Sequence, residues 1–166
     1  METNRKEALA QVLTDVLEQM AFMFTDQVDE DQPPEPAEDG LLAKMGFSGP
    51  FAGSMMLAVP AETCPLIAEN MLGMDADDER AMEKARDALK EVLNVTCGNA
   101  LTVIAGEEPV FDLTVPEVTE VDSDAWRQLA AHPDTVALLV DDYPMLLRMV
   151  MDSQGADVDS GKGSDA

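Results

Sequence analysis

The feature that most constrains this chain is a long amphipathic pattern between residues 78 and 105. At about 100° per residue, one side of a helix over this segment collects apolar side chains, and the opposite side collects polar ones and a glycine. The apolar set is Met82, Ala85, Leu89, Val92, Leu93, Ala100 and Val103, and the opposite set is Asp87, Glu91, Asn94 and Gly98. A helix with this pattern buries its first set, so the second set should face water or a partner.

The second set, which we call the polar stripe (Asp87, Glu91, Asn94 and Gly98), has two interpretations. Acidic and amide side chains at these spacings are what the solvated side of any amphipathic helix carries. As a binding face, however, Glu91 can pair with a cation, Asn94 can both donate and accept hydrogen bonds, and Gly98 leaves room for a partner's backbone. An interior helical glycine costs about 1 kcal/mol relative to alanine, which favours the second interpretation.

The remaining periodicity predicts helices interspersed with strand pairs. Residues 5–24 and 61–72 should form helices, and the buried face of the first should carry Leu9, Val12, Leu13, Val16, Leu17, Met20 and Phe24. Strands are expected over residues 41–48, 53–59, 110–115, 135–140 and 145–151, and a short helix near residues 123–129. The order α-β-β-α-α-β-β-β favours an α+β domain with an antiparallel-rich sheet whose helices cover one face.

Particular residues mark where these elements should begin and end. Asn4 with Glu7 suits the start of the first helix, and Asp77 or Asp78 suits the start of the longest one. Gly73 is a natural end for the helix over residues 61–72. A strong turn signal, Asp141-Asp-Tyr-Pro144, separates the last two strands.

Two segments have compositions that disfavour packed structure. Residues 26–39 contain seven acidic residues, no basic ones and three prolines, so we expect a flexible acidic loop over residues 26–40. Residues 153–166 are rich in Gly, Ser and Asp and should form a disordered tail. The chain is therefore expected to fold as a single domain over residues 1–152.

The charge balance excludes several classes of function. The chain has 34 Asp and Glu against 10 Lys and Arg, a formal net charge of −24. Such a surface repels nucleic acid and anionic lipid and favours basic partners. No apolar run approaches the roughly 20 residues that a membrane span requires, and no signal peptide is visible, so a cytoplasmic protein is expected.

Candidate chemistry outside the stripe is sparse. Cys64 and Cys97 are too far apart in sequence for a zinc cluster or a redox pair and are expected to be idle, buried thiols. His132, the only histidine, is expected on the surface, and without a second histidine neither a Ser/His triad nor a histidine metal cluster can form. The acidic run at residues 75–79 does not fit an EF-hand, because arginines occupy the sixth and twelfth positions of that loop.

The stripe is also part of a longer motif. Asp87-x-x-x-Glu91-x-x-Asn94 is followed after 21 intervening residues by Pro116, and three further segments accompany it, residues 47–60, 70–74 and 94–100. This ordered set resembles the signature of the CheC/CheX/FliY family of chemotaxis phosphatases. The resemblance extends over roughly residues 5–152.

The resemblance implies a pseudo-twofold domain in which the helices over residues 5–24 and 78–105 are equivalent. Placing the motif on the first helix puts Thr14, Glu18 and Ala21 at its three positions. Ala21 has no amide, so that half should be inactive, and one site per chain is similar to CheX rather than CheC. CheX-type relatives pair into homodimers through their sheets, so a homodimer is expected.

The resemblance also implies a substrate, the aspartyl phosphate of a response-regulator receiver domain such as CheY. The catalytic residues would be Asn94, which holds the attacking water, and Glu91, which pairs with a receiver lysine. Asp87, Gly98 and Pro116 would contribute binding contacts. The Mg²⁺ would belong to the receiver, so no cofactor of this chain's own is expected. The alternative is a non-catalytic adaptor of the same fold that binds receivers or flagellar-switch components.

Overall fold

The computed structural model of the protein describes residues 2–28, 35–75 and 77–152. The predicted tail over residues 153–166 and the middle of the predicted acidic loop lie outside the described residues. The elements, in chain order, are α1 (Glu2–Ala21), β1 (Thr25–Gln27), β2 (Asp39–Ser48), β3 (Gly53–Pro60), a short 3-10 helix (Ala61–Thr63), α2 (Cys64–Leu72), α3 (Ala81–Ala105), β4 (Asp112–Leu113), β5 (Glu117–Asp122), α4 (Ser123–Ala131), β6 (Val136–Val140) and β7 (Tyr143–Met151).

Within the described residues, the strands form one seven-stranded sheet in which every pairing is antiparallel. Its order is β1-β6-β7-β3-β2-β4, and β5 also pairs with β2. The two halves of the sheet repeat one pattern. In one half, β1 follows α1 and pairs with β6, the outer strand of the β6–β7 hairpin. In the other half, β5 comes after α3 and pairs with β2, the outer strand of the β2–β3 hairpin. The inner strands β7 and β3 meet at the centre. This order confirms the predicted α+β fold and has the twofold arrangement of halves that the resemblance implied.

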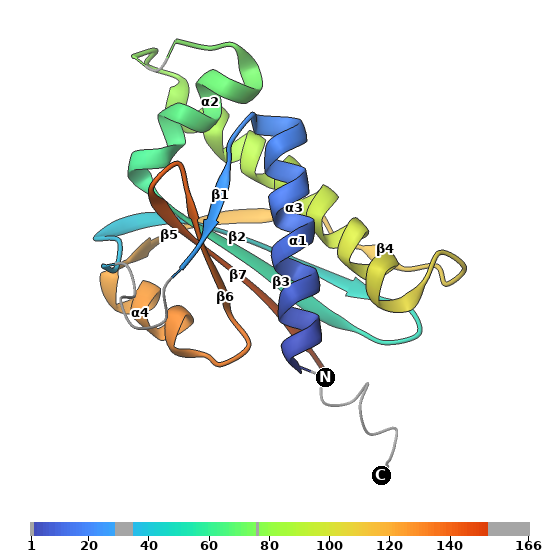
Figure 1. The fold of residues 1–166 in the computed structure, drawn as a ribbon. Coiled ribbons are helices and arrows are strands. Elements are labelled where there is room, and N and C mark those ends of the chain that lie inside the picture. The colour runs from blue at the N-terminus through green and yellow to red at the C-terminus, as the bar shows by residue number, and fades with distance from the viewer. Residues whose placement is uncertain (1, 29–34, 76, 153–166) are drawn as a thin grey trace.

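The main core lies between the sheet and the two long helices, α1 and α3, which pack on one face of it (Figure 1). The strands contribute every second residue to this face, as the two-residue period of a strand requires. Leu13 of α1, Leu93 of α3, Leu57 of β3 and Leu147 of β7 are all fully buried there. The apolar periodicity of the sequence therefore places both long helices.

A second, smaller core on the opposite face corrects the expectation that the helices cover one face only. Ala58 and Leu146 alternate with the core residues of β3 and β7, and both are buried beneath Trp126 of α4. The predicted short helix is thus confirmed, but it packs on the other side of the sheet. Asp122 caps it, because its carboxylate accepts a 2.9 Å hydrogen bond from the Ala125 N–H.

Two strands were not predicted, because neither has an apolar face of its own. β1 begins within one residue of the predicted acidic loop, yet Thr25 and Gln27 pair with Val140 and Leu138 of β6. The loop over residues 26–40 is also shortened at its other end, where β2 begins at Asp39. β5 is a solvated edge strand with no fully buried residue. Backbone pairing with a neighbouring strand, which local composition does not report, forms both.

The ends of the two long helices differ from the predictions. α1 begins at Glu2, before Asn4, and ends at Ala21, so Phe24 lies outside the helix and is 68% exposed. α3 begins at Ala81, and the Asp78 carboxylate accepts from the Arg80 N–H at 2.9 Å instead of capping the helix. That bond and the Arg80 side chain hold the pKa of Asp78 below its usual range.

Two residues of the predicted apolar face of α3 are also exposed, Met82 by 42% and Val103 by 59%. The buried arc turns gradually along this long helix, so the outlying members of the predicted face leave the core. Other end signals are confirmed. Gly73 follows α2 with a φ of 65°, and the turn between β6 and β7 places Asp141 and Asp142 at positive φ. No helix in the described ranges is both long and apolar enough to cross a membrane.

Candidate functional site

The polar stripe lies on the outer side of α3, where the sequence predicted it. Asp87, Glu91 and Asn94 are exposed, and Gly98 is half-buried. The opposite side of the same helix turns is anchored in the main core, where Leu89, Val92 and Leu93 are at most 1% exposed and Cys97 is fully buried. A helix of 25 residues fixed in this way presents its outer side chains on a rigid backbone.

The stripe side chains are free to engage a partner. In the part of the chain that the structure describes, the side chains of Asp87, Glu91 and Asn94 form no hydrogen bond or ion pair with other residues. At 1.5 Å of rise per residue, Glu91 and Asn94 lie about 4.5 Å apart along the helix axis, on adjacent turns. One anion and one amide, neighbouring and unpaired, can therefore reach a single bound surface together.

Gly98 continues the stripe as open space. A Cβ atom built on Gly98 would have no heavy atom within 4 Å, and its φ is not in the left-handed region. Neither packing nor backbone conformation of this chain therefore requires a glycine. Besides the backbone bonds of the helix, the Gly98 carbonyl oxygen accepts a 3.1 Å hydrogen bond from the Thr102 hydroxyl.

Pro116, the last residue of the motif, is half-buried between β4 and β5. The segment before it is tied to β2, because the Thr114 N–H donates to the Gly46 carbonyl at 2.9 Å and the Gly46 N–H donates to the Thr114 hydroxyl at 2.8 Å. The segment after it is tied to α3, because Arg86 Nη1 donates to the Val118 carbonyl at 3.3 Å. Pro116 thus belongs to a loop fastened on both sides.

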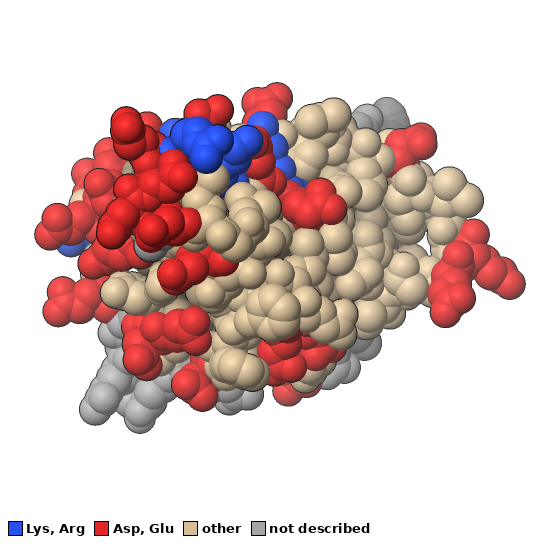
Figure 2. Space-filling model, turned by 90° about the horizontal axis from the view of Figure 1, so that it is seen from above, with Lys and Arg blue, Asp and Glu red and all other residues tan. Residues whose placement is uncertain are grey.

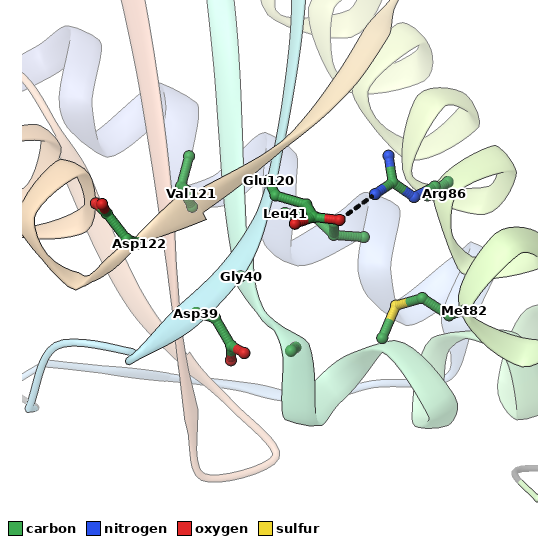
Figure 3. Close-up of a pocket in the computed structure, with 9 residues that line it drawn as sticks. Asp39, Gly40, Leu41, Met82, Arg86, Glu120, Val121 and Asp122 are labelled. Carbon is green, nitrogen blue, oxygen red and sulfur yellow. Dashed lines mark hydrogen bonds and ion pairs between the residues drawn. The ribbon is translucent and has the colours of Figure 1, made fainter.

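Arg86 is the residue near the stripe that the sequence analysis missed. Its Nη2 also donates to Glu120 Oε2 at 3.2 Å, so a side chain next to Asp87 joins α3 to the edge strand β5. Figure 3 shows this pair at the wall of an open groove of about 460 Å³. The groove is lined by Asp39, Gly40, Leu41, Ala61, Met82, Arg86, Glu120, Val121 and Asp122. Its lining comes from four separate segments, so only the fold could reveal it.

The equivalent positions on α1 are different in character. Ala21 is fully buried, Glu18 is exposed, and the Thr14 hydroxyl lies 2.8 Å from that of Thr25 in β1. The α1 half therefore presents no amide at the position that corresponds to Asn94.

The other candidates stay outside the stripe. Cys64 and Cys97 are buried and free, as predicted, and burial raises the pKa of each thiol to about 11, so both are protonated near neutral pH. His132 is exposed at the end of α4, as predicted. No group of three or more His, Cys, Asp or Glu side chains among the described residues is placed to hold a metal ion.

Comparison with known proteins identifies the family of the chain. The family model described as chemotaxis phosphatase CheX matches residues 41–136, which is more than half of the 166-residue chain and includes the whole polar stripe and Pro116. No curated protein matches the chain in sequence.

Solved structures of chemotaxis proteins share the fold. CheX from Vibrio vulnificus is 18% identical with a TM-score of 0.65, and the match covers 92% of this chain and 99% of that one. CheX from Desulfovibrio desulfuricans is 16% identical with a TM-score of 0.63, covering 90% and 99%. A CheX–CheY–BeF3–Mg²⁺ complex from Borrelia burgdorferi matches with 21% identity and a TM-score of 0.56, covering 87% and 96%. The family match and the shared fold agree, and the chain therefore belongs to the CheX family of chemotaxis phosphatases.

Proposed function

We propose that this protein hydrolyses the aspartyl phosphate of a CheY-like receiver domain, with Asn94 as the residue that positions the attacking water. The observation that carries the proposal is the state of the Asn94 side chain, which is exposed on a buried and rigid helix and, within the described residues, unpaired. Membership of the CheX family supports the substrate class. The partner is supported by the Borrelia burgdorferi structure, in which CheX is in complex with CheY.

The chemistry demands little beyond positioning. An acyl phosphate is already labile, so hydrolysis is accelerated by holding one water in line with the phosphorus atom. A carboxamide is not a useful base, but its oxygen can accept a hydrogen from that water while its NH₂ donates to a phosphoryl oxygen. Because α3 is fixed to the sheet, Asn94 would enter the receiver's site with little loss of conformational freedom.

Glu91 is proposed to orient the docked partner. It is exposed one turn before Asn94, so it can meet a receiver cation while the amide reaches the phosphoryl group. A charge-assisted pair that loses water on docking is worth more than a pair on an open surface. Asp87 extends the acidic edge by one more turn, Gly98 admits the partner's backbone, and Pro116 shapes the bordering loop. The proposal places the Mg²⁺ in the receiver.

The predicted homodimer and cytoplasmic location stay predictions. Pairing through the sheet would require an exposed edge, and β1 and β5 lie at the two sides of the sheet. The polar stripe lies on a helix over one face of that sheet, so pairing at an edge leaves the proposed chemistry within one chain.

The test follows the loss of phosphate from a phosphorylated CheY-like receiver in the presence of wild type, Asn94→Ala, Glu91→Ala and Asn99→Ala. Asn99 is a matched control, because it is an exposed asparagine on the same helix but outside the stripe. Asn94→Ala should lose about a hundredfold in rate while it still binds, and Glu91→Ala should also bind more weakly. Asn99→Ala should equal wild type. A wild type that binds the receiver without speeding its dephosphorylation would make the protein an adaptor.

A further inference from the structure

Two aromatic side chains just after the end of α1 are mostly exposed to solvent. Phe22 is 69% exposed and Phe24 is 68% exposed, whereas Met23 between them is fully buried. The other phenylalanines of the chain behave differently, because Phe47, Phe51 and Phe111 pack edge to face with ring centroids 5.0 to 6.2 Å apart. Exposed large apolar side chains that occur together are a feature of protein interaction sites.

The backbone conformation at Phe22 is unusual for a phenylalanine. Phe22 directly follows the last residue of α1 and has a φ of 53°, in the left-handed region. Glycine or asparagine commonly takes this position, because a larger side chain is strained there. The ring offsets little of that strain, since most of its surface stays in water. Folding alone therefore does not explain a phenylalanine at this position.

The segment that carries the two rings is fixed to its neighbours. The Phe24 carbonyl accepts a 3.2 Å hydrogen bond from the Asp141 N–H, and the Phe24 N–H donates to Asp141 Oδ1 at 3.4 Å. The hydroxyls of Thr14 and Thr25 meet at 2.8 Å and join β1 to α1. The rings are therefore presented from a held backbone, which reduces the entropy cost of binding through them.

The charged side chains of the segments that carry the rings, and of the turn between β6 and β7 beside them, all have one sign. Glu18 lies one turn before Phe22, and Asp26, Asp141 and Asp142 are exposed on the elements beside it. The segments that build this surface contain no lysine or arginine, since none occurs in residues 7–43 or 128–147. Figure 2, which views the molecule from the side where α1 ends, shows uncharged surface with groups of carboxylates beside it and one group of Lys and Arg on the same face. A second copy that docked through these same segments would oppose acid with acid, so the partner that fits the rings and their adjacent carboxylates is basic.

We propose that Phe22 and Phe24 form a docking surface for a partner protein whose contact segment combines apolar side chains with lysine or arginine. Phenylalanine is enriched in protein interfaces, where apolar side chains occupy the centre and polar side chains the rim. This surface lies at the end of α1, in the half of the fold whose Ala21 offers no amide, whereas the polar stripe lies on α3. The proposed catalytic residues and the docking surface thus lie in different halves of the fold, and the docking surface does not depend on the proposed phosphatase activity.

The test uses a short synthetic peptide of leucine and lysine as the probe, with two matched peptides in which serine replaces leucine or glutamate replaces lysine. The wild type should bind the leucine–lysine peptide at least about tenfold more tightly than the Phe22→Ser/Phe24→Ser double variant or than either matched peptide binds. A Val110→Ser/Val115→Ser double variant is the control, because both valines are 80% exposed elsewhere, and it should bind like wild type. Equal binding by the phenylalanine variant overturns the proposal.

A second variant separates docking from folding. Phe22→Gly removes backbone strain together with a ring that is mostly exposed, so its melting temperature should stay within about 4 °C of wild type while peptide binding falls. A larger drop in melting temperature would show that Phe22 is a structural residue and would overturn the proposal. Sedimentation of both phenylalanine variants tests whether a second copy of the chain occupies the surface instead. A shift from dimer to monomer would identify the surface as a contact between copies and would also overturn the proposal.

Discussion

Replacing Gly98 by alanine should make the protein more stable and its receiver docking weaker. Gly98 is an interior residue of α3, where glycine costs about 1 kcal/mol relative to alanine. A new Cβ would meet no heavy atom within 4 Å, so no clash offsets this gain. The free energy of unfolding should therefore rise by about 1 kcal/mol, which corresponds to a rise in melting temperature of about 2–4 °C for a chain of this length.

The same methyl group occupies the space that the proposal reserves for a partner's backbone. Gly98→Ala should therefore raise the KM for the phosphorylated receiver and leave kcat nearly unchanged, because Glu91 and Asn94 are untouched. Urea unfolding followed by circular dichroism gives the free energy of unfolding. The rate of phosphate loss, measured against receiver concentration, gives KM and kcat.

Gly106 provides the matched control for this prediction. A Cβ on Gly106 would also have no neighbour within 4 Å, but its φ is 90°, so alanine there is strained and Gly106→Ala should lose stability. A Gly98→Ala protein that is less stable than wild type would refute the reasoning about the helix. A more stable protein with unchanged KM would refute the reasoning about docking.

Two further predictions concern the core. Trp126→Ala should lower the free energy of unfolding by about 3–5 kcal/mol, because the buried ring fills the smaller core under α4. Trp126→Phe should lower it much less. Urea unfolding followed by circular dichroism measures both changes, and two small changes would show that Trp126 has only a surface role. Burial raises the pKa of Cys64 and Cys97 from 9.0 to about 11, so the unfolded chain loses these protons first. Their contribution to stability is therefore fully present below pH 9 and is lost as pH rises to 11, by up to about 1.4 kcal/mol per pH unit for each thiol. Urea unfolding of reduced protein across this range should show a shallower decline for Cys97→Ala than for wild type, and an identical decline would contradict the assignment.

The parts of this fold that the sequence predicts are those encoded in local periodicity. The exposed stripe of Asp87, Glu91 and Asn94 could be placed because a helix repeats every 3.6 residues and its opposite side is strongly apolar. The hairpin of β2 and β3 could be placed for a similar reason, since glycines and a proline punctuate two strand patterns.

The parts that escaped prediction depend on contacts between distant segments. β5 has charged residues at Glu117 and Glu120 and no buried side chain, so only its pairing with β2 makes it a strand. The face that α4 covers is set by Trp126, which packs on Leu146 of β7. Arg86 could not be singled out, because its partner Glu120 is 34 residues away. Such contacts appear in no local pattern of charge or hydropathy.

The central claim is that the exposed amide of Asn94 supplies the catalytic step. The most direct measurement is the first-order loss of phosphate from a CheY-like receiver with Asn94→Ala protein in saturating excess, compared with wild type and Asn99→Ala. Saturation removes any difference in affinity, so the rate reports the chemical step alone. The account predicts that Asn94→Ala returns the decay close to that of the receiver by itself, while wild type and Asn99→Ala accelerate it equally. Acceleration by Asn94→Ala equal to that of wild type would contradict it.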